Sequence, residues 1–154
     1  MQVIHLETGS KKNISIELIA GEDLKKTTKA RYFFNWKSEL KYDVFKLSLV
    51  DNNEILGLMS LAYFEDEKRV EIKLLAVSQE NRGKNKLYEG IVGNLIAHAC
   101  RQALRLHAED GCVSLIPKTE LKKHYIKEYG MTDAGWQIFV EREPLLKLIQ
   151  KYKI

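Results

Sequence analysis

The sequence has few cysteines and prolines and no long apolar run. Its two cysteines, Cys100 and Cys112, make no disulfide framework, which favours a reducing cytoplasm. Neither they nor the four histidines stand at metal-ligand spacing, so no metal site is expected. No apolar stretch reaches the roughly 18 residues of a membrane span, and the first residues lack a signal-peptide pattern. We therefore expect a cytoplasmic protein without a membrane partner.

Length and composition predict one globular domain over residues 1–154. Apolar residues make up 45% of the chain and charged residues 30%, a balance typical of folded, soluble domains. No repeat and no linker rich in proline or glycine divides the sequence. The net charge of +4 is compatible with an anionic partner. Because no RNA-binding motif accompanies that charge, we expect no nucleic-acid partner.

Apolar periodicity predicts strands alternating with helices. Strands are expected at residues 2–7, 13–20, 43–50, 54–64, 70–77, 111–116 and 136–141. Helical segments are expected at 21–36, 87–106, 118–130 and 144–154. The helix at 87–106 has Leu87, Ile91 and Leu95 on one apolar face. This order predicts an α/β or α+β domain with a mixed central sheet flanked by helices.

The stretch LLAVSQENRGKNKLYEG combines a strand, a basic turn and a helical pattern. A helix that begins directly after a strand exposes unpaired N–H groups, which suit a phosphate. A P-loop is excluded because Ser78 stands where glycine is required and Asn85 follows Lys84. The dinucleotide fingerprint is excluded because the turn has one glycine rather than three. The basic residues Arg82, Lys84 and Lys86 then either bind an anion or form a solvated turn.

This stretch and the order of elements resemble the GNAT superfamily of acyl-CoA-dependent N-acyltransferases over residues 14–140. The resemblance implies a mostly antiparallel sheet and acetyl-CoA as co-substrate. The family turn reads Arg/Gln-x-x-Gly-x-Gly/Ala; Arg82 takes its first position, while Asn85 and Leu87 replace two small residues. The cofactor-binding residues that the resemblance implies are Leu75, Ala76, Val77, Arg82, Gly83, Lys84, Asn85, Lys86 and Leu87.

The resemblance also implies two catalytic residues. VEIKLLAVS matches a family pattern in which the glutamate, here Glu71, is the general base. The alternative for Glu71 is an ion pair with Lys73, two residues along the same strand face. Family members carry a tyrosine acid before the sixth strand. Alignment on Gly130 puts Ile126 at that position and leaves Tyr125 as the nearest candidate.

These residues imply an N-acetyltransferase that acts on a primary amine of a small molecule or a protein. The alternative is a catalytically inactive GNAT-fold module that binds or regulates, because Asn85, Leu87 and Ile126 depart from the family pattern. An RNA-bound acceptor is a further alternative that only the net charge supports. The aromatic segment YFFNWK, residues 32–37, either lines the acceptor pocket or packs in the core. The acceptor is not identified by the sequence, and a homodimer stays open.

Overall fold

The computed structural model describes residues 1–154, which form two compact units. Unit 1 comprises Met1–Ser60 and Leu74–Leu95, and unit 2 comprises Leu61–Lys73 and Ile96–Ile154. Two long strands and the longest helix each contribute residues to both units. The prediction that the whole chain is a single domain stays a prediction.

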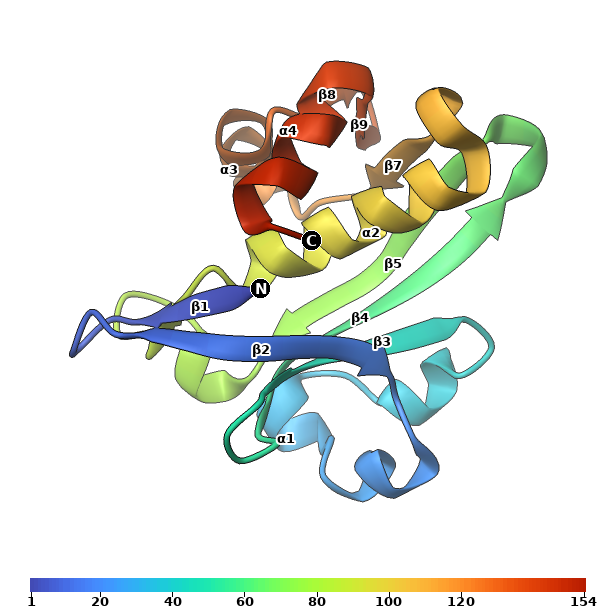
Figure 1. Cartoon of the computed structure of the whole chain (residues 1–154). Coiled ribbons are helices and arrows are strands. Elements are labelled where there is room, and N and C mark those ends of the chain that lie inside the picture. The colour runs from blue at the N-terminus through green and yellow to red at the C-terminus, as the bar shows by residue number, and fades with distance from the viewer. The chain divides into compact units, whose positions relative to one another are not determined.

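Unit 1 is built on a sheet whose strand order is β6-β1-β2-β3-β4-β5 (Figure 1). Its strands are β1 (Gln2–His5), β2 (Lys11–Leu18), β3 (Asp43–Leu49), the start of β4 (Ile55–Phe64), the end of β5 (Arg69–Val77) and β6 (Tyr88–Glu89). β1 pairs antiparallel with both β2 and β6, and β2 pairs antiparallel with β3. The sequence predicted each of these strands except β6.

The segment between β2 and β3 folds into short helical turns and closes the core of unit 1. They are a 3₁₀ turn at Gly21–Lys25, helix α1 (Lys29–Tyr32) and a 3₁₀ turn at Trp36–Glu39. Tyr32 and Trp36 are buried with Val44, Ile55, Leu58 and Ala76. The Tyr32 hydroxyl donates to the carbonyl of Ile55 at 2.6 Å, and the Trp36 indole donates to the carbonyl of Tyr32 at 3.1 Å. Core packing is therefore confirmed for two of the aromatic residues in YFFNWK.

Gly57 on β4 allows helix α2 (Ile91–His107) to begin close to the sheet of unit 1. A Cβ atom at residue 57 would lie 2.8 Å from Cγ2 of Ile91, 3.1 Å from Cδ1 of Leu95 and 3.3 Å from the carbonyl oxygen of Ala76. The side chain of Ile91 is β-branched and stiff, so it cannot move aside at low cost. Close packing of strand, helix and β5 at this point depends on the missing side chain.

We expect Gly57→Ala to lower the free energy of unfolding by about 1–3 kcal/mol, the usual cost of overpacking a core. Urea denaturation of the two proteins measures the difference. Gly21→Ala is the matched control, because a Cβ atom at residue 21 would meet nothing within 4 Å. Equal midpoints for Gly57→Ala and the parent would show that α2 can shift away from the sheet.

Unit 2 contains the parallel part of the fold. Its strand order is β4-β5-β7-β9-β8, with β7 at Cys112–Leu115, β8 at Thr132–Ala134 and β9 at Gln137–Glu141. Residues Arg69–Ile72 of β5 pair in parallel with all of β7, whereas β7 with β9 and β8 with β9 are antiparallel. Its helices are the later part of α2, α3 (Lys122–Tyr129) and α4 (Arg142–Tyr152) (Figure 1). The predicted mixed, mostly antiparallel sheet with flanking helices is confirmed.

Most differences from the predicted elements concern where helices begin. Helix α2 begins at Ile91, four residues later than expected, because the chain first forms β6 against β1. Helix α3 begins at Lys122 after a 3₁₀ turn, and ends at Gly130 with φ of 66° as predicted. Helix α4 begins at Arg142, which places Pro144 in its first turn, where proline is tolerated. No helix combines the length and apolar character that crossing a membrane requires.

Candidate functional site

The turn after β5 is a loop of unit 1 whose two ends are joined by Asn81. The buried side chain of Asn81 donates to the Ser78 hydroxyl at 2.8 Å and accepts from the backbone N–H of Tyr88 at 2.9 Å. The N–H of Ser78 in turn donates to the carbonyl of Leu56 on β4 at 2.9 Å. The loop Arg82–Leu87 is thereby held at both ends although its own residues are mostly exposed.

The loop has basic side chains and an uncrowded backbone at Gly83. Gly83 has φ of +76° and no atom within 4 Å of the place where a Cβ would lie. Lys84 is exposed and forms no ion pair, whereas the Lys86 ammonium lies 2.8 Å from a carboxylate oxygen of Glu89. Arg82 stacks on the ring of Phe33, with its Cζ atom 4.0 Å from the ring centroid. This arrangement leaves Arg82 and Lys84 as the cations available to an anion.

Helix α2 begins after the residues that were predicted to form its first turn. Leu87 lies in the loop, 41% exposed, and its carbonyl accepts from the N–H of Leu6 at 2.9 Å. The prediction that Leu87 lies on the apolar face of the helix is therefore wrong, since the helix begins at Ile91. Gly90, with φ of +98°, comes directly before the helix. Tyr88 and Glu89 form β6 between the loop and the helix.

Helix α1 and the residues after it contact this loop within unit 1. The Arg31 guanidinium forms ion pairs with Glu54, at 2.9 Å, and with Glu80 in the 3₁₀ turn Gln79–Asn81. Hydrogen bonding to Glu80 raises the pKa of Arg31. The stack of Phe33 against Arg82 is a second link. Two side chains of one short segment therefore position the loop that follows β5.

Phe33 has a strained backbone. It ends α1 with φ of +71°, a region that large side chains rarely adopt and that costs of order 1–3 kcal/mol. Asparagine tolerates this conformation better than other residues do. Phe33→Asn should therefore keep or raise stability while it removes the ring beneath Arg82.

We expect Phe33→Asn to weaken acetyl-CoA binding about 3-fold to 30-fold, as loss of a cation–π contact worth about 0.5–2 kcal/mol implies. Isothermal calorimetry measures the affinity, and a melting curve confirms that the variant is folded. Phe34→Asn is the comparison, since Phe34 packs on the Trp36 cluster without contacting Arg82 in this way. Equal affinity in the parent and Phe33→Asn would show that the stack does not prepare Arg82 for binding.

Glu71 lies on β5 in unit 2 and is engaged by two cations. Its side chain is 7% exposed; Oε1 accepts from Arg69 at 3.0 Å, and Oε2 lies 2.8 Å from the Lys73 ammonium. Arg69 also donates to the Ser114 hydroxyl at 2.8 Å and to Glu67 at 2.7 Å. The ion pair with Lys73, the alternative to catalysis, is thus present. Both carboxylate oxygens have a partner, and Lys73 is the more exposed of the two cations.

Tyr125 lies on α3 in unit 2 among other rings. Its ring centroid is 5.7 Å from that of Tyr129 and 6.1 Å from that of His124. Burial raises the pKa of Tyr125, which keeps its hydroxyl protonated at neutral pH. Ile126, at the family's tyrosine position, is partly buried on the same helix. A tyrosine hydroxyl is protonated at neutral pH without this shift, so the raised pKa does not by itself mark Tyr125 as the acid.

Similarity to known proteins is found in solved structures. No family model matches the sequence, and no curated protein matches it. Spermidine/spermine N-acetyltransferase SpeG from Vibrio cholerae, solved with manganese ions, is 14% identical; the match covers 87% of this chain and 95% of that chain, with a TM-score of 0.62. A dodecameric spermidine N-acetyltransferase from the same organism is also 14% identical, with 86% and 96% covered and a TM-score of 0.61.

Ard1 from Thermoplasma volcanium is 12% identical, and the match covers 84% of this chain and 97% of that chain with a TM-score of 0.61. The chain shares the fold of these N-acetyltransferases. At identities this low the likeness concerns the fold alone, so the activity has to be argued from this chain's own residues.

Two residues that position the turn after β5 could not be identified from the sequence. Phe33 is far from Arg82 in the chain, and only the structure brings them together. Asn81 resembles any polar turn residue until its bonds to Ser78 and Tyr88 are seen.

Proposed function

We propose that this protein is an N-acetyltransferase that transfers an acetyl group from acetyl-CoA to a primary amine. The observation that carries the proposal is the turn after β5, which presents Arg82, Gly83 and Lys84 in a GNAT fold. Acetyl-CoA would supply the activated acetyl group. The turn suits its pyrophosphate because Gly83 leaves open space and Lys84 has no acidic partner.

The proposed cofactor contacts all belong to unit 1. Backbone groups of Leu75 to Val77 at the end of β5 would bind the cofactor and donate to the developing oxyanion. The four-residue ladder with β7 uses Arg69–Ile72, so these later residues extend past it. Arg82 to Leu87 would bind the phosphates, with Arg82 and Lys84 supplying charge. Asn85 and Leu87 lie in the loop before β6 and would contribute through the backbone.

The proposed proton transfers belong to residues of unit 2. Glu71 would accept a proton from the substrate ammonium at Oε2, the oxygen that now faces the Lys73 ammonium. A substrate ammonium resembles the lysine ammonium in charge and size, so one can replace the other at this oxygen. Tyr125 would donate its hydroxyl proton as the thiolate leaves. A thiol with a pKa near 8.5 leaves readily, so this donor adds less than the base.

A second candidate is a GNAT-fold module that binds without turnover. The specific observation in its favour is that both oxygens of Glu71 are engaged by Arg69 and Lys73. Such a carboxylate can be a structural ion pair and nothing more. The two candidates agree on cofactor binding and differ only in turnover.

The test combines cofactor binding with turnover. Calorimetry with acetyl-CoA tests the turn, and release of free thiol with a panel of primary amines tests the reaction. Binding with turnover supports the enzyme, and binding without turnover supports the module. No heat of binding at millimolar acetyl-CoA would contradict both.

The partners and the location follow from the same proposal. The acceptor is a small molecule or a protein that carries a primary amine, and no metal takes part. We infer a cytoplasmic location from the absence of a disulfide framework in the sequence. A homodimer is the proposed assembly; the dodecameric neighbour shows that larger assemblies form on this fold.

A further inference from the structure

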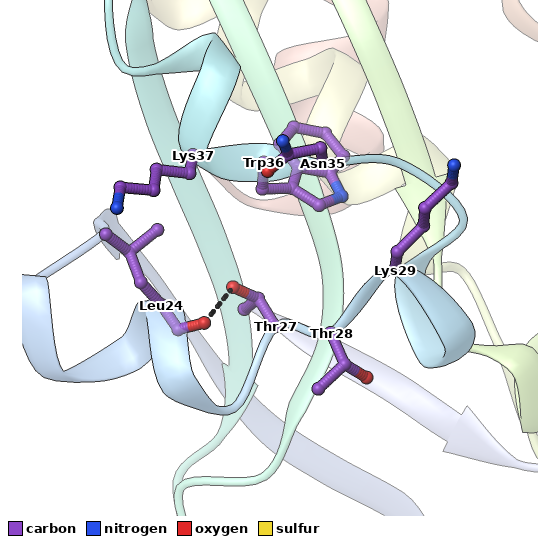
Figure 2. Close-up of a pocket in the computed structure, with 7 residues that line it drawn as sticks. All are labelled: Leu24, Thr27, Thr28, Lys29, Asn35, Trp36 and Lys37. Carbon is purple, nitrogen blue, oxygen red and sulfur yellow. Dashed lines mark hydrogen bonds between the residues drawn. The ribbon is translucent and has the colours of Figure 1, made fainter.

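A pocket of about 460 Å³ lies in unit 1 beside helix α1 (Figure 2). It is lined by Leu24, Thr27, Thr28, Lys29, Asn35, Trp36 and Lys37. This size is within the range of pockets that hold small ligands. The lining comes from one continuous segment between β2 and β3, so the pocket does not depend on how the two units are placed.

The pocket is cationic. Lys29 and Lys37 are exposed, lie on opposite sides of the pocket in Figure 2, and form no ion pair. Two other basic residues of this unit are neutralised: Lys46 pairs with Asp23 at 2.8 Å, and Arg31 pairs with Glu54 and Glu80. None of the lining residues is acidic. Two unpaired ammonium groups around one cavity attract an anion and repel a cation.

The remaining walls suit a short ligand with a polar end. Trp36 is buried and provides an apolar wall, and Leu24 is the second apolar residue of the lining. The side-chain amide of Asn35, between the two lysines in Figure 2, makes no hydrogen bond within the protein. The Thr27 hydroxyl already donates to the carbonyl of Leu24 at 3.3 Å. The free donors are therefore the two ammonium groups, the Asn35 amide and the Thr28 hydroxyl, which only accepts from the N–H of Arg31, and this set matches the oxygens of a carboxylate.

The same segment reaches the proposed cofactor region of unit 1. Trp36 is in one buried cluster with Ala76 of β5, and Leu74 packs against that cluster. Arg31 and Phe33, which lie between the two lysines in the chain, contact Glu80 and Arg82. The segment that lines the pocket therefore also contacts the end of β5 and the turn that follows it.

We propose that this pocket binds a carboxylate of the acceptor, so that the acceptor is a primary amine that also carries a carboxylate group. This inference rests on the proposed function, because it names the substrate class of that reaction. It separates this chain from its structural neighbours named for spermidine, a polycation without a carboxylate. Lys29 and Lys37 would repel a second ammonium and would hold an acidic group by charge-assisted hydrogen bonds.

The turnover test compares three amines of equal chain length: 6-aminohexanoate, 1,6-diaminohexane and hexylamine. We expect kcat/KM with acetyl-CoA to be about 10-fold to 100-fold higher for 6-aminohexanoate, as charged hydrogen bonds imply. The double variant Lys29→Gln/Lys37→Gln should remove this preference through KM, and Lys29→Glu/Lys37→Glu should reverse it in favour of the diamine. Lys25→Gln is the control, an exposed lysine of the same segment outside the pocket.

A binding test separates this inference from the proposed function. The chain has two tryptophans, so Trp136→Phe leaves Trp36 in the pocket wall as the fluorescent reporter. Titration with 6-aminohexanoate should give a saturable change that hexylamine does not give and that Lys29→Gln/Lys37→Gln abolishes. This measurement needs neither acetyl-CoA nor turnover.

The outcomes are distinct. A saturable signal without turnover of any amine would overturn the proposed enzyme and keep the carboxylate pocket. Turnover without preference for 6-aminohexanoate, or a preference that survives in the double variant, would overturn the pocket and keep the enzyme. Absence of both signal and turnover would overturn both.

Discussion

Replacing Glu71 by glutamine is expected to lower acetyl transfer per folded molecule by about 10²–10⁴-fold at neutral pH, the usual contribution of a general base. Glutamine keeps the shape of the side chain and still accepts the hydrogen bond from Arg69. It loses the ability to take a proton from the substrate ammonium. The rate should recover partly at higher pH, where free amine becomes available without a base. Acetyl-CoA affinity should stay unchanged, because the proposed phosphate contacts lie in the turn.

Lys73→Gln is the matched control for this experiment. It removes the ammonium 2.8 Å from Oε2 of Glu71 but keeps the carboxylate and its bond to Arg69. If Glu71 is the base, the Lys73→Gln variant should react at least as fast as the parent. If Glu71 only forms an ion pair, Lys73→Gln should lower the stability of the fold. Melting curves of both variants measure that stability, with a change of roughly 1–3 kcal/mol expected when a buried charged group loses its partner. Equal rates for the parent, Glu71→Gln and Lys73→Gln would remove Glu71 from the mechanism.

Replacing Arg82 by alanine is expected to raise the dissociation constant of acetyl-CoA about 10-fold to 100-fold. A hydrogen bond between charged groups contributes about 1.5–3 kcal/mol, and 1.4 kcal/mol corresponds to a factor of ten. Arg82 is also held in place by Phe33, so little side-chain freedom is lost when the phosphate binds. Calorimetry at several salt concentrations measures the effect, which should diminish as salt screens the charges.

Two variants make this result specific. Arg82→Lys keeps the charge but loses the planar group that stacks on a ring and binds two oxygens, so its affinity should fall between those of the parent and Arg82→Ala. Lys11→Ala removes an exposed positive charge on β2 and should have no effect. If Arg82→Ala binds as well as the parent, the turn is a solvated one, as the sequence alone also allowed.

The longer strands and helices were predictable from the sequence because they are either amphipathic, as β2 and β9 are, or apolar nearly throughout, as β4 is. Ile14 and Ile16 alternate with polar residues on β2, and the apolar face of α2 repeats at helical spacing. β6 and β8 were missed for a physical reason: each has only two or three residues, none of them buried, so neither has an apolar face to recognise. Short strands of this kind form because a neighbouring strand offers a partner.

The site was predictable only where it is local in the chain. Arg82, Gly83 and Lys84 form a recognisable basic turn, and the pairing of Glu71 with Lys73 follows from strand alternation. The late start of α2 could not be read from the sequence, since Leu87 has the correct spacing for the apolar face of the helix. The late start of the helix is decided by the pairing of Tyr88 with His5, which lies on the first strand and far from Tyr88 in the sequence. Long-range pairing of this kind is invisible to periodicity.

The pairing of β6 with β1 also couples ligand binding at the loop to the stability of the first strand. The proposed phosphate loop is continuous with β6, and β6 is held by the first strand through His5 and by the bond from Leu6 to Leu87. A ligand that orders the loop therefore also stabilises the first strand against local opening, and the amide protons of β1 should exchange more slowly when the cofactor is bound. Amide exchange at this edge of the sheet should therefore report whether the cofactor is bound, and it can be measured without a catalytic assay.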